Sequence, residues 1–170
     1  MKKAKLVVGL GAALLASVAI AAIAAVASFT LTRPAPQVTF NAISGETVST
    51  AELRGKVVLV NFWATYCSAC IKEMPKLVNA HHKFSARGYE TIAVAVWRDS
   101  PARVAQFAAE HALPFKVALD SSGQLGRDFG NVRITPMSFL IGRTGKVLRR
   151  YVGEPDWAEL HEVVERELRS

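Results

Sequence analysis

The chain has 170 residues, of which 51% are hydrophobic, and a formal net charge of +7. This length fits one domain with a sizeable core. Met1–Lys5 holds three of the 21 basic residues, and the remaining 18 exceed the 14 acidic residues only mildly, which argues against a nucleic-acid-binding function.

The N-terminus combines a short basic segment with a long apolar run. Residues 6–32 are 27 residues without a charge. As a helix with a rise of about 1.5 Å per residue they would extend about 40 Å, more than the bilayer core of about 30 Å. We therefore predict that residues 1–32 are a membrane anchor. The small residues 25–28 leave a cleaved signal peptide as the alternative. In both cases the lysines stay inside and the rest of the chain is exported. The expected location is the bacterial inner membrane, with a single span and a periplasmic domain, or the periplasm itself after cleavage.

Short elements precede the first core strand. Residues 33–37 carry alternate prolines and are predicted to form an extended linker, which leaves residues 38–170 as the domain. Apolar and polar side chains alternate in residues 37–48, which predicts a small hairpin that turns at Ser44-Gly45. The sequence Ser49–Leu53 predicts a capped turn.

A buried strand followed by two cysteines comes next. The apolar run Val57–Val60 predicts a central strand that is covered on both faces. A helix is expected from Ser68, so Cys67 lies at its electropositive end, where unpaired amides and the helix dipole favour thiolate over thiol. Cys70 lies one turn deeper, and residues three apart have Cβ atoms about 5 to 6 Å apart, so a disulfide can close after local adjustment. Cys67 is therefore the predicted nucleophile.

Both cysteines of the chain lie in this CxxC motif. A loop this short removes little entropy from the unfolded chain, so a disulfide between them would add little stability. The alternative is that both cysteines are buried as small apolar residues. In an exported domain that begins a helix with this motif, the pattern favours redox chemistry over a structural role.

Strands and helices alternate after the CxxC motif. The helix from Ser68 to about Arg87 is predicted to kink at Pro75. Its expected buried face recurs at three- and four-residue spacing: Ile71, Met74, Leu77, Val78, His81 and Phe84. Further strands are expected over residues 91–96, 115–119, 138–141 and 146–152, with further helices after residues 99, 123 and 155. This order predicts an α/β fold of four or five strands with helices on both faces.

Three separate motifs resemble the membrane-tethered TlpA/ResA/CcmG branch of the thioredoxin-like thiol-disulfide oxidoreductases. They are Asn61–Tyr66 before the cysteines, Glu73 after them, and Thr135-Pro136 further on. The resemblance extends from Val38 to the C-terminus. It implies a thioredoxin-like three-layer sandwich with a central mixed sheet, an N-terminal hairpin, and a central helix-strand insert over residues 100–119.

The resemblance also implies a role for Thr135-Pro136. In the family the matching proline follows a cis peptide bond and faces the disulfide. The backbone of Thr135 can then pair with an extended substrate segment and hold its disulfide in line with Cys67. The alternative is an ordinary proline at the start of a strand.

Glu73 is the predicted proton acceptor for Cys70, since it lies three residues further along the same helix. A partly buried carboxyl has a raised pKa, which suits it to take the proton from a thiol that must attack a mixed disulfide. Minimal thioredoxins place an aspartate on the preceding strand, where this chain has Asn61. The alternative is a solvated glutamate on the helix surface.

Residues around the predicted substrate groove complete the candidate site. We expect Trp63 to pack against the active-site helix and Tyr66 to border the groove, and we predict both as substrate-binding residues, with ordinary core packing as the alternative. Ile134 stands where the family commonly has glycine, and Met137 where it commonly has threonine. These differences bear on the identity of the partner more than on the reaction.

The sequence predicts no metal site and no cofactor beyond a redox-active Cys67–Cys70 disulfide. One CxxC motif supplies two ligands, whereas a closed zinc site needs four. The four histidines have no ligand spacing to it: His81, His82, His111 and His161.

The predicted function is therefore reduction of disulfides in partner proteins outside the cytoplasm. Cys67 attacks a substrate disulfide, and Cys70 then releases the reduced substrate with the help of Glu73. The resemblance implies apocytochrome c or copper-site proteins as substrates and a transmembrane thiol electron donor of the DsbD or CcdA type. The alternatives are a periplasmic disulfide oxidase or isomerase, and a noncatalytic metal chaperone or adaptor on the same fold.

Overall fold

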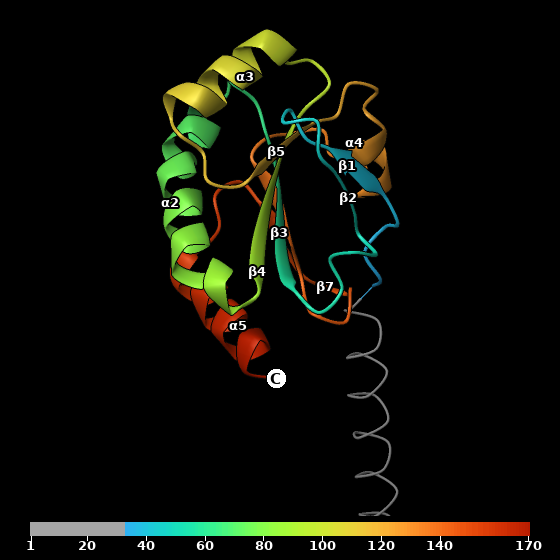
Figure 1. The fold of residues 1–170 in the computed structure, drawn as a ribbon, viewed down its shortest axis with the longest axis vertical. Helices are drawn as coiled ribbons and strands as arrows, with labels where there is room; N and C mark the ends of the chain where they lie inside the picture. Colours follow the sequence, from blue (N-terminus) through green and yellow to red (C-terminus); the bar gives the residue numbers. More distant parts are fainter. Residues whose placement is uncertain (1–32) are drawn as a thin grey trace, which may run out of the picture. The chain divides into compact units, whose positions relative to one another are not determined.

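The computed structural model describes residues 33–170 (Figure 1). The predicted anchor or signal peptide lies outside the described residues. Within residues 33–170, no helix combines the length and apolar character that crossing a membrane requires.

A five-stranded mixed sheet forms the centre of the domain, in the order β5-β4-β3-β6-β7. The strands are β3 (Val57–Trp63), β4 (Tyr89–Ala95), β5 (Lys116–Leu119), β6 (Met137–Ile141) and β7 (Val147–Val152). β3, β4 and β5 are parallel, whereas β6 and β7 run antiparallel to their neighbours. The connection from β3 to β4 runs through a helix, as parallel neighbours require.

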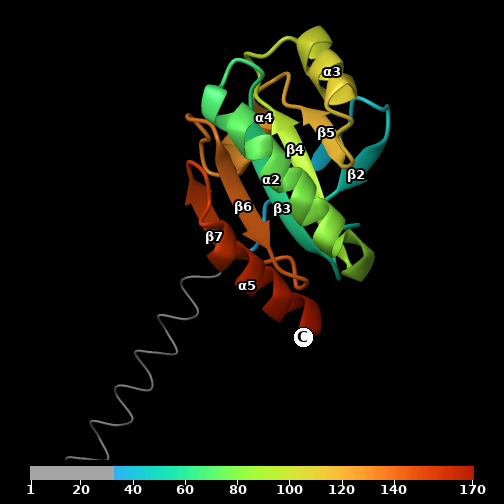
Figure 2. The same ribbon diagram turned by 90° about the vertical axis from the view of Figure 1, so that its left-hand side faces the viewer.

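Helices cover both faces of this sheet. They are α2 (Ser68–Phe84), α3 (Pro101–Glu110), α4 (Gln124–Asp128) and α5 (Trp157–Arg169). One apolar cluster joins the sheet to α2, α3 and α5, and a second joins its other face to α4 and the N-terminal hairpin. Figure 1 shows these layers on either side of the strands, and Figure 2 shows α2 and α5 side by side over the sheet. The predicted thioredoxin-like sandwich is confirmed, with α3 and β5 as the central insert.

β3 is buried on both faces along its whole length. Its side chains alternate, so that Leu59 and Trp63 join the cluster under α2, and Val58, Val60 and Phe62 join the cluster under α4. An uninterrupted apolar run is the pattern that such a position needs. The CxxC motif follows shortly after the end of this strand.

The N-terminal hairpin pairs β1 (Thr39–Asn41) with β2 (Thr47–Ser49). Its Phe40 side chain is fully buried against the sheet. The predicted capped turn follows, because the Glu52 carboxylate accepts from the Ser49 amide at 2.7 Å while the Ser49 hydroxyl accepts from the Glu52 amide at 3.2 Å. Both predictions for this region are confirmed.

The compact unit begins at Pro34, earlier than the expected domain start at Val38. The Ala35 amide donates to the Gly145 carbonyl at 2.9 Å, and the Ala35 side chain is buried. Pro34 also forms an isolated bridge with Lys146. Pro34 and Ala35, which fall in the predicted linker, thus contact the turn between β6 and β7.

The buried face of α2 differs from the prediction. Ile71 is 39% exposed, whereas Cys70, Glu73 and Ala80 are buried. Met74, Leu77 and Phe84 of the predicted face are buried, but the buried stripe continues toward the N-terminus through Cys70 and Glu73. Ile71 lies about 100° around the helix from Cys70 and faces outward. The helix ends near the predicted point, at a short 3₁₀ turn closed by Gly88 with φ +96°.

We expect Phe62→Ala to lower the free energy of unfolding by about 3 to 5 kcal/mol, because it empties a fully buried position. The Phe62 ring lies 5.4 Å from the Phe129 ring and 6.0 Å from the Phe139 ring, between centroids. Urea unfolding of the oxidised protein measures the change. Ile43→Ala, at a position 37% exposed, is the control and should cost under about 1 kcal/mol. Equal losses in the two variants would contradict the assigned core.

Candidate active site

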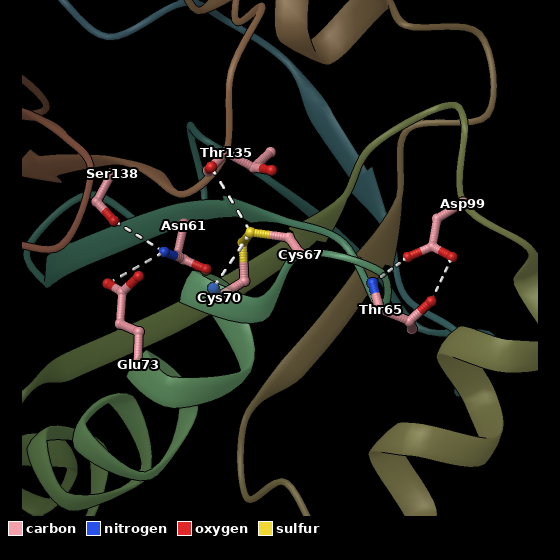
Figure 3. Close-up of a disulfide and its surroundings, with 8 residues drawn as sticks. All are labelled: Asn61, Thr65, Cys67, Cys70, Glu73, Asp99, Thr135 and Ser138. Atoms are coloured by element: carbon pink, nitrogen blue, oxygen red, sulfur yellow. Dashed lines mark hydrogen bonds between the residues drawn. A yellow bond between two sulfur atoms is a disulfide. The ribbon is translucent and has the colours of Figure 1, made fainter.

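The two cysteines lie where β3 ends and α2 begins (Figure 3). Cys67 is the N-cap of α2 with extended backbone, and Cys70 lies in its first turn. They form a disulfide with Cα atoms 5.2 Å apart. Cys67 is partly exposed, whereas Cys70 is 1% exposed, so the outer sulfur alone is open to a macromolecular partner.

Two backbone groups lie against the Cys67 sulfur. The Cys70 amide donates to Cys67 Sγ at 3.2 Å, and the Thr135 carbonyl oxygen lies 3.6 Å from the same atom (Figure 3). The amide belongs to the unpaired first turn of the helix, where the macrodipole is positive. The Cys70 amide and the macrodipole stabilise a negative charge on Cys67 Sγ, as the sequence predicts for a nucleophile, whereas the Thr135 carbonyl oxygen does not.

The Thr135-Pro136 peptide bond is cis, which confirms the expectation from the family resemblance. Pro136 is buried directly before β6, and its carbonyl accepts from the Gly153 amide at 2.9 Å. The end of β7 therefore holds this loop from behind. The loop brings the Thr135 backbone, which is distant in sequence, next to Cys67.

A buried polar cluster lies on the Cys70 side of the disulfide (Figure 3). Glu73 is completely buried, together with Asn61 of β3 and Ser138 of β6. Asn61 Nδ2 donates to Ser138 Oγ at 2.9 Å and to Glu73 Oε1 at 3.5 Å. The predicted proximity of Glu73 to the inner cysteine agrees with this geometry, and the alternative of a solvated glutamate is wrong.

Burial raises the pKa of Glu73 to about 8. Desolvation is the main cause, and the negative charge of Glu154 adds to it, while Lys76 and the Asn61 hydrogen bond oppose it. Glu73 Oε2 has no hydrogen-bond partner among residues 33–170, and an unpaired buried oxygen further favours the neutral form. At neutral pH this carboxyl therefore holds a proton.

Sequence reasoning missed Asp99, which fixes the loop before Cys67. Its carboxylate accepts from the Thr65 amide at 2.5 Å and from the Thr65 hydroxyl at 2.7 Å (Figure 3). It also accepts from the Ser100 amide at 2.8 Å, at the start of α3. Because β3 and β4 are parallel, the residues that follow them meet at the same sheet edge. From this rule, the sequence could have predicted that Asp99 lies close to the residues before Cys67.

The structure places Trp63 in the core, as the alternative to the predicted substrate-binding role describes. Its side chain is fully buried, and its ring lies 5.1 Å from Phe107 of α3, between centroids. The residue falls on the helix-covered face of β3, so a substrate protein cannot reach it. Tyr66, in contrast, is 57% exposed.

A groove of about 620 Å³ opens beside Cys67. Tyr66, which precedes Cys67 in the sequence, and Thr135, whose carbonyl oxygen lies 3.6 Å from the Cys67 sulfur, both line it. The complete lining is Tyr66, Val96, Trp97, Arg98, Val132, Arg133, Ile134 and Thr135. Ile134, which stands where the family commonly has glycine, thus lines the groove, and its side chain is 55% exposed.

The histidines lie elsewhere. His81 packs on Phe115 and His161 packs on Phe84, both in partly buried aromatic contacts. Among residues 33–170, no three His, Cys, Asp or Glu side chains gather as a metal site would require.

Comparison with known proteins agrees with this geometry. The Redoxin family model matches residues 31–166. The thiol-disulfide oxidoreductase ResA of Bacillus thuringiensis subsp. konkukian is 31% identical over 134 residues, covering 79% of this chain and 76% of the relative. ResA of Bacillus subtilis is 33% identical over 128 residues, covering 75% and 70%.

A solved structure also matches. The crystal structure of a thiol:disulfide interchange protein of the thioredoxin family from Chlorobium tepidum superimposes with a TM-score of 0.73 at 28% identity. The match covers 81% of this chain and 97% of that one. With a CxxC disulfide at the start of α2, a cis-proline loop facing it and these relatives, the chain belongs to the Redoxin family and is a ResA-like thiol-disulfide oxidoreductase of thioredoxin fold.

Proposed function

We propose that this oxidoreductase reduces disulfides in partner proteins outside the cytoplasm. The observation that carries the proposal is the pairing of a partly exposed Cys67 with a buried Cys70 that lies near a buried Glu73, whose pKa of about 8 leaves an ionised fraction able to accept a proton. An exposed sulfur can start an exchange, and a sheltered sulfur with its own proton acceptor can complete it.

The reaction begins with the dithiol form. The Cys67 thiolate attacks one sulfur of a substrate disulfide, and the other substrate sulfur leaves as a thiolate that takes up a proton. Cys70 then gives its proton to the ionised form of Glu73 and attacks Cys67 Sγ. The Cys67–Cys70 disulfide forms, and the second substrate sulfur leaves as a thiolate that takes up a proton. Two electrons pass from the protein to the substrate; one of the two protons comes from Cys70 through Glu73, and the other comes from the solvent.

Glu73 serves the second step. A carboxyl with a pKa of about 8 lies close to the value of about 8.5 for a free thiol, so a proton moves between the two at little free-energy cost. An ordinary glutamate, with a pKa near 4.5, would hold a thiol proton poorly. Burial of Glu73 is therefore the feature that makes it an effective partner for Cys70.

The backbone around Thr135 binds the substrate segment. Among the described residues, the amides of Arg133, Ile134 and Thr135 donate no backbone hydrogen bond. An extended peptide that pairs with this edge would present its cysteine to Cys67, since the Thr135 carbonyl lies 3.6 Å from that sulfur.

Residues 1–32 anchor the domain on the outer side of the membrane in this proposal. The supporting observations are the basic Met1–Lys5 segment and the 27 uncharged residues that follow it. Electrons then come from a transmembrane thiol donor of the DsbD or CcdA type. The substrates are apocytochromes c or the cysteine pairs of copper sites, as the resemblance to the ResA branch implies.

Cys70→Ala should trap substrate proteins as mixed disulfides on Cys67, because the resolving sulfur is missing. Non-reducing gels and mass spectrometry of the purified full chain would identify the partners. Cys67→Ala/Cys70→Ala is the matched control and should retain none of them. Recovery of the same proteins with the double variant, or of none with Cys70→Ala, would sink the proposed function.

We expect Glu73→Gln to slow resolution of a preformed mixed disulfide by about a hundredfold at neutral pH, because the proton acceptor for Cys70 is gone. Rapid-quench measurement of substrate release across pH checks this. The wild-type rate should rise as pH increases through about 8, the pKa of Glu73. Glu162→Gln, on the exposed face of α5, is the control. Identical pH profiles for Glu73→Gln and wild type would refute the role.

The same substitution should stabilise the fold. The folded-state pKa of Glu73, about 8, lies above its ordinary value of 4.5. Its contribution to the stability of the fold is therefore fully present at a pH below 4.5 and is lost as pH rises toward 8. Because of this group alone, the free energy of unfolding of the wild type should be about 3 kcal/mol lower at pH 7 than at a pH below 4.5. Glu73→Gln should not show this decrease. Urea unfolding of both oxidised proteins at the two pH values measures the difference. A constant gap between them would contradict the raised pKa.

A further inference from the structure

The groove beside Cys67 carries positive charge without any acidic residue in its lining. Arg98 and Arg133 both line it, and the other lining residues are uncharged. Among residues 33–170, neither arginine forms a salt bridge or a side-chain hydrogen bond, whereas Arg87 and Arg149 are held by glutamates. The guanidinium of Arg98 lies 4.7 Å from the centre of the Trp97 ring.

Asp99 does not neutralise this charge, although it is next to Arg98 in sequence. Both of its carboxylate oxygens accept hydrogen bonds from Thr65, and one also accepts from Ser100. Both carboxylate oxygens are therefore already hydrogen-bonded, to the active-site loop and to the start of α3. The two groove arginines are left with unused donors, which in a guanidinium match the geometry of a carboxylate.

Large apolar side chains accompany the arginines. Trp97 and Arg98 follow β4, while Arg133 and Ile134 precede the cis-proline, so each of these two lining segments supplies one cation and one apolar group. Trp97 is 57% exposed and Ile134 is 55% exposed. Exposed apolar groups of this size beside free cations mark a binding surface for a peptide that has both acidic and apolar side chains.

We propose that the groove selects substrate segments in which acidic and apolar residues flank the target cysteine. This inference rests on the proposed function and names the class of protein substrate that the site takes. Carboxylates of the segment pair with Arg98 and Arg133, its apolar side chain packs on Trp97 or Ile134, and its backbone pairs beside Thr135. Charge complementarity raises the rate of encounter, and the same two arginines repel basic segments.

The test separates binding from redox chemistry. Three peptides share one intramolecular disulfide and one flanking leucine, and their two other flanking positions are glutamate, glutamine or lysine. Calorimetry measures their binding to the full chain with Cys67→Ser/Cys70→Ser, which cannot exchange disulfides. We expect the glutamate peptide to bind about tenfold more tightly than the glutamine peptide at low ionic strength, with a smaller difference in high salt.

Adding Arg98→Gln/Arg133→Gln to this background should abolish the preference for glutamate. The control Arg103→Gln/Arg166→Gln removes the same charge from exposed helix positions outside the groove and should keep the preference. Equal binding of all three peptides, no binding of any, or a preference that survives Arg98→Gln/Arg133→Gln would overturn the inference.

Reduction of the same peptides by the wild-type dithiol form distinguishes the two proposals. Faster reduction of the glutamate peptide agrees with both. Equal rates for the three peptides would overturn the selectivity and leave the reductase function intact. Failure to reduce any of them, with the glutamate preference in binding retained, would overturn the reductase function alone.

Discussion

Burial of β3 on both faces fixes the position of every reactive group in this protein. The strand from Val57 to Trp63 lies under α2 and α3 on one side and under α4 and the hairpin on the other. Packing therefore holds its end against the helix that begins five residues later. Asp99 adds a second restraint on that short connection through Thr65. Cys67 is held at the helix N-terminus, facing the Thr135 backbone, by packing that lies mostly outside the site itself.

The same packing imposes a cost at Glu73. A carboxyl that is completely buried, with one oxygen unpaired, works against folding at neutral pH. Asn61 and Ser138 offset part of this cost, since the amide of Asn61 connects them to Glu73. Leucine or methionine would fit a buried helix position better, so the presence of an acid beside Cys70 is most simply understood through the proton that the second cysteine must lose.

Much of the fold could be predicted from sequence because β3 and the later strands have clear apolar patterns. The CxxC motif, Glu73 and the cis-proline were found through their spacing and the family resemblance. What failed depended on three-dimensional detail. The buried face of α2 is set by how the helix packs on the sheet, which places Cys70 and Glu73 inside and Ile71 outside. The depth of Trp63 follows from its side of β3, and the Asp99–Thr65 contact joins two loops that meet only in the folded sheet.

The bond between Asp99 and Thr65 also changes how the α3–β5 insert should be regarded. Asp99 and Ser100 form the entry to that insert, so the segment preceding Cys67 is attached to a part of the chain that a minimal thioredoxin lacks. A change at the start of the insert would therefore act on Thr65, two residues before Cys67, without altering the two residues between the cysteines.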